Sequence, residues 1–329
     1  IQPGLDRYYE IQVVDDPRGV SRSETDETSV NNGPVTTTDT TKTFQNKIRF
    51  TALFAKNFYD FTIKAGLIEN AGGFAALLDI EQLDGEHKFI LLDTGWNPEF
   101  MEKRFKDCGI DKMLQNGEID CLFMSHEHFD HFWGLPVTMK YNNKIDMYIG
   151  GDYYPEGLEY IKQCGFEGKL HTTQSKTYHD FPIFDKNGKQ IQGVAGYYFP
   201  IGIICRVFGE ESLFFNIKDH GIVQVTGCCH QGILQMAEVC KATFKGGDKP
   251  YGVYGGLHIS PFNDWDPRYD DLVLGLGAYG FQKIGCNHCT GSLAAHKFVE
   301  AGYGVVPGSA SCGSTCPDYL GNGDTIVFG

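Results

Sequence analysis

Residues 125–135, with the sequence Ser-His-Glu-His-Phe-Asp-His-Phe-Trp-Gly-Leu, constrain the fold of this chain more than any other stretch. Four potential metal ligands fall within six residues: His126, His128, Asp130 and His131. The preceding residues, 121–124, predict a short buried strand, and open α/β sheets place their sites at the carboxyl ends of such strands. A loop at this point would turn all four side chains inward. The stretch therefore predicts a metal site at a strand end.

Three later histidines, His230, His258 and His288, each follow an expected strand. Their neighbours are small: Gly-Cys-Cys-His-Gln-Gly at 227–232, Gly-Gly-Leu-His at 255–258 and Cys-Asn-His-Cys-Thr-Gly at 286–291. Small residues let the backbone turn sharply and direct an imidazole into a crevice. Each histidine alone would more simply be structural. Together with the first cluster, they indicate metal binding.

Composition narrows the class of partner. The net charge of -14 and the scattered Lys and Arg residues argue against a nucleic-acid partner, which needs a concentrated basic surface. No apolar run approaches the roughly 18 to 20 residues that span a bilayer. The 41% of hydrophobic residues is ordinary for a soluble protein. We therefore expect a small-molecule substrate and no membrane partner; the oligomeric state cannot be derived from the sequence.

The chain is expected to have two parts. Residues 1–45 lack hydrophobic periodicity and predict an extended arm or surface loop, whereas residues 46–329 predict a single domain. Eleven cysteines, an odd number, argue against a fully paired disulfide framework and favour a reducing compartment such as the cytoplasm. Because the chain begins at Ile1 without Met, export after removal of a leader is the alternative.

Strands and helices are expected to alternate into two mixed sheets with outer helices. Asn97 is the expected N-cap of a helix that Gly109 ends. The expected strands are 49–54, 74–80, 88–92, 121–124, 146–149, 213–217, 221–226, 250–254, 282–285 and 325–328. The expected helices are 98–108, 155–164, 232–244, 267–276 and 292–301.

The His-x-His-x-Asp-His pattern resembles the signature of the metallo-β-lactamase superfamily at every position, and Leu-Leu-Asp-Thr-Gly at 91–95 resembles an upstream element of that family. The glycine–cysteine–histidine elements resemble the subgroup that includes dihydropterin-ribofuranosylaminobenzene phosphate synthase. The resemblance covers the chain from about residue 49 onward. It implies an α/β fold, placed in α+β by some schemes, in which two mixed sheets and flanking helices form a four-layer αββα sandwich.

The resemblance also implies ligands for two ions, with Asp93 orienting the ligand loop. His258 stands where many family members carry a bridging Asp, and is implied to be a ligand, an acid for the leaving group or a contact to substrate phosphate. Asp130 and His258 are the catalytic candidates. The implied ligands are His126, His128 and His230 for one ion, and Asp130, His131 and His288 for the other.

Imidazole-rich ligation fits zinc, iron or manganese better than magnesium, and zinc is favoured. The expected function is hydrolysis of an ester, lactone or phosphate ester of a small molecule by metal-bound hydroxide. A pterin-diphosphate transferase is one alternative and an iron-dependent redox enzyme another, although His128 stands where diiron relatives usually carry Glu. A binding protein that keeps the fold would be expected to have lost ligands, and the first motif is complete.

Several residues carry weaker predictions. Asn57, Phe129 and Trp133 are candidates for substrate contacts, although the two aromatic residues fit plain packing equally well. Cys228 or Cys229 could approach the metal as a thiolate or be a small buried residue. Further cysteines predict either a four-sulfur zinc site, a disulfide or free thiols: Cys286, Cys289, Cys312 and Cys316.

Overall fold

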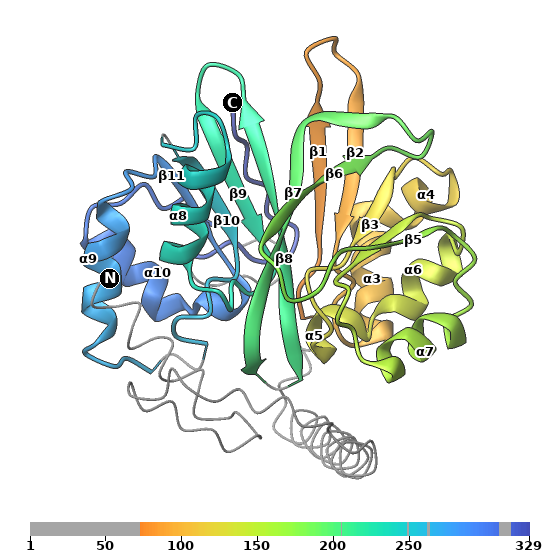
Figure 1. The fold of residues 1–329 in the computed structure, drawn as a ribbon. Coiled ribbons are helices and arrows are strands. Elements are labelled where there is room, and N and C mark those ends of the chain that lie inside the picture. The colour runs from red at the N-terminus through yellow and green to blue at the C-terminus, as the bar shows by residue number, and fades with distance from the viewer. Residues whose placement is uncertain (1–72, 205, 249, 262–263, 309–316) are drawn as a thin grey trace, which may run out of the picture. The chain divides into compact units, whose positions relative to one another are not determined.

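The computed structural model describes residues 73–329 except 205, 249, 262–263 and 309–316. In these residues two β-sheets pack face to face, and helices cover the outer side of each (Figure 1). The predicted four-layer αββα sandwich is therefore confirmed. The expected arm at 1–45, the expected strand at 49–54 and Asn57 lie outside the described residues.

The first sheet has the strand order β1-β2-β3-β4-β5. Its strands are β1 (Ala76–Glu81), β2 (His87–Leu92), β3 (Cys121–Phe123), β4 (Met147–Ile149) and β5 (Leu170–Thr172). The strands β2 to β5 run parallel, and β1 is antiparallel to β2. Because side chains alternate along a strand, Leu91 packs with the helices while Ile90 and Leu92 pack against the other sheet.

The helices of this half are α3 (Pro98–Cys108), α4 (Ile110–Gln115), α5 (Phe129–Phe132), α6 (Leu135–Tyr141) and α7 (Pro155–Gln163). The side chain of Asn97 accepts a hydrogen bond from the Phe100 amide at 2.9 Å, and Gly109 ends α3 with φ 76°, as predicted. The expected loop at 125–135 is wrong in part. His128 accepts a hydrogen bond from the Phe132 amide at 3.1 Å, so Asp130 and His131 lie on a helical turn.

The second sheet has the order β11-β10-β9-β8-β7-β6. Its strands are β6 (His179–Phe184), β7 (Gln190–Ile204), β8 (Val207–Ile217), β9 (Gly221–Thr226), β10 (Pro250–Gly255) and β11 (Lys283–Cys286). The predicted β8–β9 hairpin is confirmed, and β9, β10 and β11 run parallel. Strands β6 and β7 were not predicted. The helices that cover this sheet are α8 (Ile233–Thr243), α9 (Tyr269–Gly277) and α10 (Ser292–Glu300).

The expected closing strand at 325–328 is wrong, because these residues form no regular element. Side chains hold the segment in place of a strand ladder. Lys283 Nζ donates to the Val327 carbonyl at 2.9 Å, and the Phe328 ring packs edge-on against Tyr251. Apolar composition alone does not make a strand, because strand formation depends strongly on the tertiary context.

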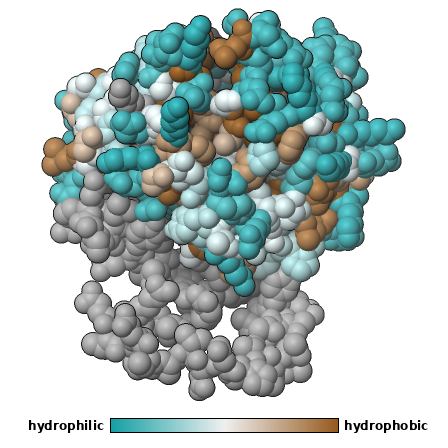
Figure 2. All heavy atoms as spheres, turned by 45° about the horizontal axis from the view of Figure 1, so that its top comes forward, coloured by the Kyte–Doolittle hydropathy of each residue, from teal (hydrophilic) through white to brown (hydrophobic). Residues whose placement is uncertain are grey.

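The coloured part of the face drawn in Figure 2 is mainly hydrophilic, with hydrophobic side chains scattered over it. The large exposed hydrophobic side chains of the described residues include Leu83 and Leu274. None of the described helices is both long and apolar enough to cross a bilayer.

Candidate metal centre

The predicted ligands lie directly after the carboxyl ends of strands in both sheets. The first cluster follows β3, His230 follows β9, His258 follows β10, and His288 begins the short 3-10 helix η2 (His288–Thr290) after β11. In Figure 1, α5 lies beside the lower ends of both sheets. Two sheet edges therefore contribute to one site, as expected for α/β folds.

One group of possible ligand atoms comes from His126, His128 and His230, which all lie within 4.8 Å of one another. His126 Nε2 is 3.0 Å from His128 Nδ1. The His230 ring crosses both others edge-on, with centroid distances of 4.8 and 4.9 Å. His126 is fully buried. Its burial, and to a smaller extent the neighbouring imidazoles, hold the pKa of His126 well below its usual range. Both effects favour the neutral imidazole, which is the form that binds a cation.

A second group comes from Asp130, His131 and His288, again within 4.8 Å of one another. His131 Nε2 is 3.1 Å from His288 Nε2, which is 3.3 Å from Asp130 Oδ2. Burial opposes the charge of Asp130, but the adjacent His131 and His288 lower its pKa below the usual range. The groups adjoin, since the rings of His126 and His131 are 4.2 Å apart.

Asp93 holds the ligand loop from the end of β2. Its buried carboxylate accepts hydrogen bonds from the Ser125 amide and hydroxyl at 2.7 Å each, and it lies 2.7 Å from His131 Nδ1. Burial raises the pKa of Asp93. Burial would lower the pKa of His131, but the carboxylates of Asp130 and Asp93 outweigh it and raise this pKa to about 9. Asp93 thus contacts both Ser125 and His131, and its orienting role stays a prediction.

Glu210 of β8 is a residue that the sequence analysis missed. Its buried carboxylate accepts the backbone N–H groups of Cys228, Cys229 and His230 at 2.6 to 3.0 Å, and it lies 2.6 Å from His230 Nδ1. Burial opposes its charge, but His230 and these N–H donors lower the pKa of Glu210 to about 2. The available signal was a pair of carboxylates, Glu210 and Glu211, inside an apolar strand, where each must find a partner.

His258 lies beside the first group, with its ring centroid 4.6 Å from that of His230. Cys228, His230 and His258 form a further set of ligand atoms within 4.8 Å. His258 Nδ1 is buried with no hydrogen-bond partner among the described residues. A buried, unsatisfied ring nitrogen next to the other imidazoles suits a ligand or a proton donor.

Four non-glycine residues of this region have the left-handed backbone conformation, in which side chains are rarely found. They are Asp93 with φ 58°, Cys229 with φ 59°, His258 with φ 45° and His288 with φ 46°. Such strain persists only where the surrounding structure enforces it, and it concentrates at functional sites. It supports the view that these loops are shaped for chemistry.

The donor set fits divalent transition-metal ions. Nδ1 of His131 and of His230 face carboxylates, which leaves Nε2 as the lone-pair donor of each ring. Bonds of 2.0 to 2.1 Å in a tetrahedral shell place neighbouring ligand atoms about 3.3 Å apart. The observed N–N and N–O separations of 3.1 and 3.3 Å match this spacing.

The predicted substrate contacts remain predictions. Phe129 packs edge-on against buried Trp96, and its ring is 5.7 Å from that of Trp133, which is 36% exposed. The four-sulfur site also stays a prediction: Cys286 packs in the core of the second sheet, and Cys289 adjoins Cys228 and His288. The other two cysteines of that prediction, Cys312 and Cys316, lie outside the described residues.

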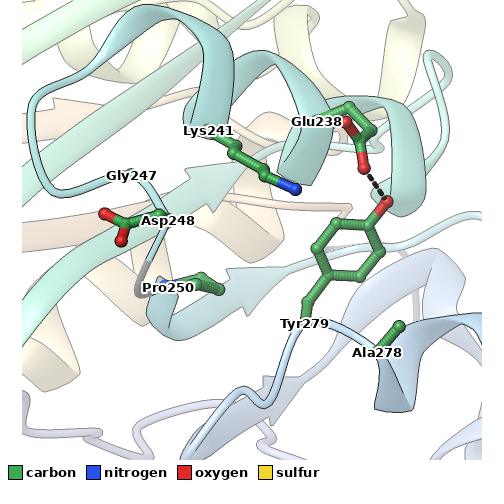
Figure 3. Close-up of a pocket in the computed structure, with 7 residues that line it drawn as sticks. All are labelled: Glu238, Lys241, Gly247, Asp248, Pro250, Ala278 and Tyr279. Carbon is green, nitrogen blue, oxygen red and sulfur yellow. Dashed lines mark hydrogen bonds between the residues drawn. The ribbon is translucent and has the colours of Figure 1, made fainter.

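A surface pocket lies away from these histidines, between α8 and the end of α9 (Figure 3). Across it, the Tyr279 hydroxyl donates to Glu238 at 2.7 Å, and Lys241 lies nearby. None of the predicted site residues lines this pocket. We assign it no part in the chemistry.

Two family models match the chain. The model of the metallo-β-lactamase superfamily matches residues 76–196, and the model of a lipocalin-like domain matches residues 1–134. Of the range matched by the lipocalin-like model, the structure describes residues 73–134. There β2 pairs in parallel with β3, and two helices lie between these strands in the sequence. This part therefore belongs to the first mixed sheet.

Among curated proteins, 7,8-dihydropterin-6-methyl-4-(β-D-ribofuranosyl)-aminobenzene-5'-phosphate synthase of Methanocaldococcus jannaschii is 26% identical over 263 residues, which cover 69% of this chain and 84% of that protein. Among solved structures, Tm1679, a metal-dependent hydrolase of the β-lactamase superfamily, is 19% identical with a TM-score of 0.47, covering 69% of this chain and 91% of the other. The metallo-β-lactamase fold protein YhfI from Bacillus subtilis is 10% identical with a TM-score of 0.41, covering 70% and 89%.

Proposed function

We propose that this chain, a member of the metallo-β-lactamase superfamily, is a metal-dependent hydrolase that acts on an ester, lactone or phosphate ester of a small molecule. The observation that carries the proposal is the pair of adjacent ligand groups at the sheet edges, each with three ligand atoms within 4.8 Å. When bound, two divalent ions supply a water whose pKa is lowered from 15.7 to about 7 and stabilise charge on a substrate oxygen.

The residues of the chain divide the remaining work. His126, His128 and His230 would hold one ion, and Asp130, His131 and His288 the other. Asp93 and Glu210 keep His131 and His230 in the tautomer that presents Nε2 to the centre. Since both carboxylates are buried, neither competes for substrate.

His258 is the proposed proton donor to the leaving group. Burial opposes its charge, but Cys289 and the carboxylates of Glu210 and Asp130 outweigh burial and raise the pKa of His258 above its usual value. A protonated imidazole at the edge of the centre can give its proton to a departing oxygen. Asp130, held ionised by the histidines beside it, would bind the second ion and orient the attacking water.

A second candidate is a transferase that joins a dihydropterin diphosphate to a ribofuranosylaminobenzene phosphate, with diphosphate as the leaving group. The archaeal relative, named as a synthase of such a compound, favours this candidate. Both reactions need the same stabilisation of negative charge on a phosphate or ester oxygen. They differ in the nucleophile, which is water in one and the second substrate in the other.

The test is a product analysis of the chain loaded with two equivalents of zinc or manganese. The substrates are bis(p-nitrophenyl) phosphate, p-nitrophenyl acetate, a γ-lactone, and a dihydropterin diphosphate with and without ribofuranosylaminobenzene phosphate. We expect hydrolysis of at least one ester or lactone, abolished by chelation. A joined pterin product with no hydrolysis of any ester would contradict the hydrolase and support the transferase.

A further inference from the structure

The sulfur of Cys228 lies among the ligand atoms of both groups. It is 3.0 Å from His131 Nε2, and within 4.8 Å of ligand atoms of the first group, from His126 and His230. It also lies within 4.8 Å of a ligand atom of His288, in the second group. Cys228 is only 3% exposed. The sulfur therefore occupies the place that a ligand shared by two ions requires.

We propose that Cys228 is a metal ligand whose thiolate bridges the two ions. The inference rests on the metal-dependent function proposed above. Two ions roughly 3.5 to 4 Å apart share a bridging atom when each is about 2.3 Å from it. Thiolate is a soft ligand that zinc accepts readily, so this chain would favour zinc over manganese.

The loop that carries Cys228 is built to hold its sulfur in place. The backbone N–H groups of Cys228 and Cys229 donate to the same Glu210 oxygen at 3.0 and 2.6 Å. The following residue turns away, because Cys229 packs with Ile233 in the apolar core under α8. One of two adjacent cysteines thus serves packing, and the other faces the histidines.

Cys289 is the rival ligand, since its sulfur lies within 4.8 Å of the sulfur of Cys228 and a ligand atom of His288. It differs in two respects. First, the Cys289 thiol donates a hydrogen bond to the Cys228 carbonyl at 3.6 Å. Second, no set of possible ligand atoms among the described residues contains both Cys289 and a histidine of the first group. The geometry therefore fits Cys289 as a neighbour of the bridge and Cys228 as the bridge.

Binding requires a proton balance. The Cys228 thiol loses its proton to solvent as the sulfur–metal bonds form, so metal uptake releases one proton per bridge. A coordinating cation deprotonates a thiol outright.

The test is X-ray absorption spectroscopy at the zinc edge on the full chain, with zinc content measured in parallel. Because a bridging sulfur contacts both ions, we expect about one sulfur per zinc at about 2.3 Å in a chain that holds two zinc ions. A sulfur bound to one ion only would give about half a sulfur per zinc, which overturns the bridge.

Three variants complete the test. The sulfur shell should disappear in Cys228→Ser and persist in Cys229→Ser and Cys289→Ser. Two zinc ions without any sulfur shell in the wild-type chain, or loss of the shell in Cys289→Ser alone, would overturn the assignment while leaving the proposed function intact. A wild-type chain that takes up no zinc would contradict both the bridging role of Cys228 and the proposed metal-dependent function. If Cys228→Ser fails to fold, Cys289→Ser decides: two separate thiolates, one on each ion, would also give one sulfur per zinc in the wild-type chain, but would fall to about half in this variant, whereas a Cys228 bridge keeps one.

Discussion

The carboxylate of Glu210 lies 2.6 Å from Nδ1 of His230, and both side chains are fully buried. The contact joins β8 to the loop after β9. Strand β8 supplies no predicted ligand itself, but its Glu210 fixes the orientation of the predicted ligand His230. Carboxylates that orient a ligating histidine raise its basicity and restrict its rotation. Glu210 is therefore the support on which the first ligand group depends.

Glu210→Gln should weaken metal binding 10- to 100-fold. It should also lower the free energy of unfolding by about 2 to 3 kcal/mol, because an amide NH₂ would face the N–H groups that the carboxylate accepts. Zinc titration and urea unfolding measure the two effects. The matched control for the zinc titration is Glu211→Gln, the same change at the next residue. Equal metal affinity in Glu210→Gln and wild type would contradict the role assigned to this contact.

Glu211→Gln should change the pH dependence of stability. Burial raises the pKa of Glu211 to about 8, so the folded chain holds a proton that the unfolded chain has lost above its pKa of about 4.3. The contribution of Glu211 to the free energy of unfolding is fully present below about pH 4 and is lost as pH rises towards 8, a loss of about 5 kcal/mol. In urea unfolding between pH 5 and 9, the free energy of unfolding of Glu211→Gln should increase relative to that of the wild-type chain as the pH rises. A constant difference would contradict it.

Gly227→Ala should disturb the second ligand group without removing a ligand. A Cβ atom there would lie 2.2 Å from Ser125 Oγ and 2.9 Å from Asp93 Oδ2, so the bonds that hold His131 must shift. We expect a loss of about 1 to 3 kcal/mol in the free energy of unfolding and weaker zinc binding. Gly202→Ala, where nothing lies within 4 Å of the added Cβ, is the control. Unchanged zinc affinity in Gly227→Ala would count against the Asp93 contacts.

His258→Gln should slow turnover in a way that depends on the leaving group. A general acid contributes about 10²- to 10⁴-fold where the departing oxygen needs a proton, and little for p-nitrophenolate. The measurement compares kcat for an alkyl ester and a p-nitrophenyl ester of one acid. A similar loss for both would show that His258 acts as a ligand or through binding.

The parts of the site that the sequence predicted were those with a local signal. The cluster at 126–131 is continuous, and His230, His258 and His288 share a strand, glycine and histidine order that can be recognised without the fold. The same holds for α3, whose cap at Asn97 and end at Gly109 lie next to the helix.

The rest depended on contacts distant in sequence. Glu210 is 20 residues from His230, and only the pairing of β8 with β9 brings the carboxylate under the loop. The expected loop contains the helical turn α5. So short a helix shows no periodicity in the sequence, because its hydrogen bonds involve only a few neighbouring residues. The segment at 325–328 has the apolar composition of a strand, but side chains hold it instead. Periodicity carries no information on such partners.

The most direct test of the metal centre is the metal content of His126→Ala/His128→Ala, compared with wild type and with His87→Ala/His296→Ala, which changes two half-exposed histidines. The chain should hold about two equivalents of zinc or a similar ion after purification without chelator. The double variant should lose most of this metal and still unfold cooperatively, whereas the control keeps it. Full metal content in His126→Ala/His128→Ala, or none in wild type, would contradict the account.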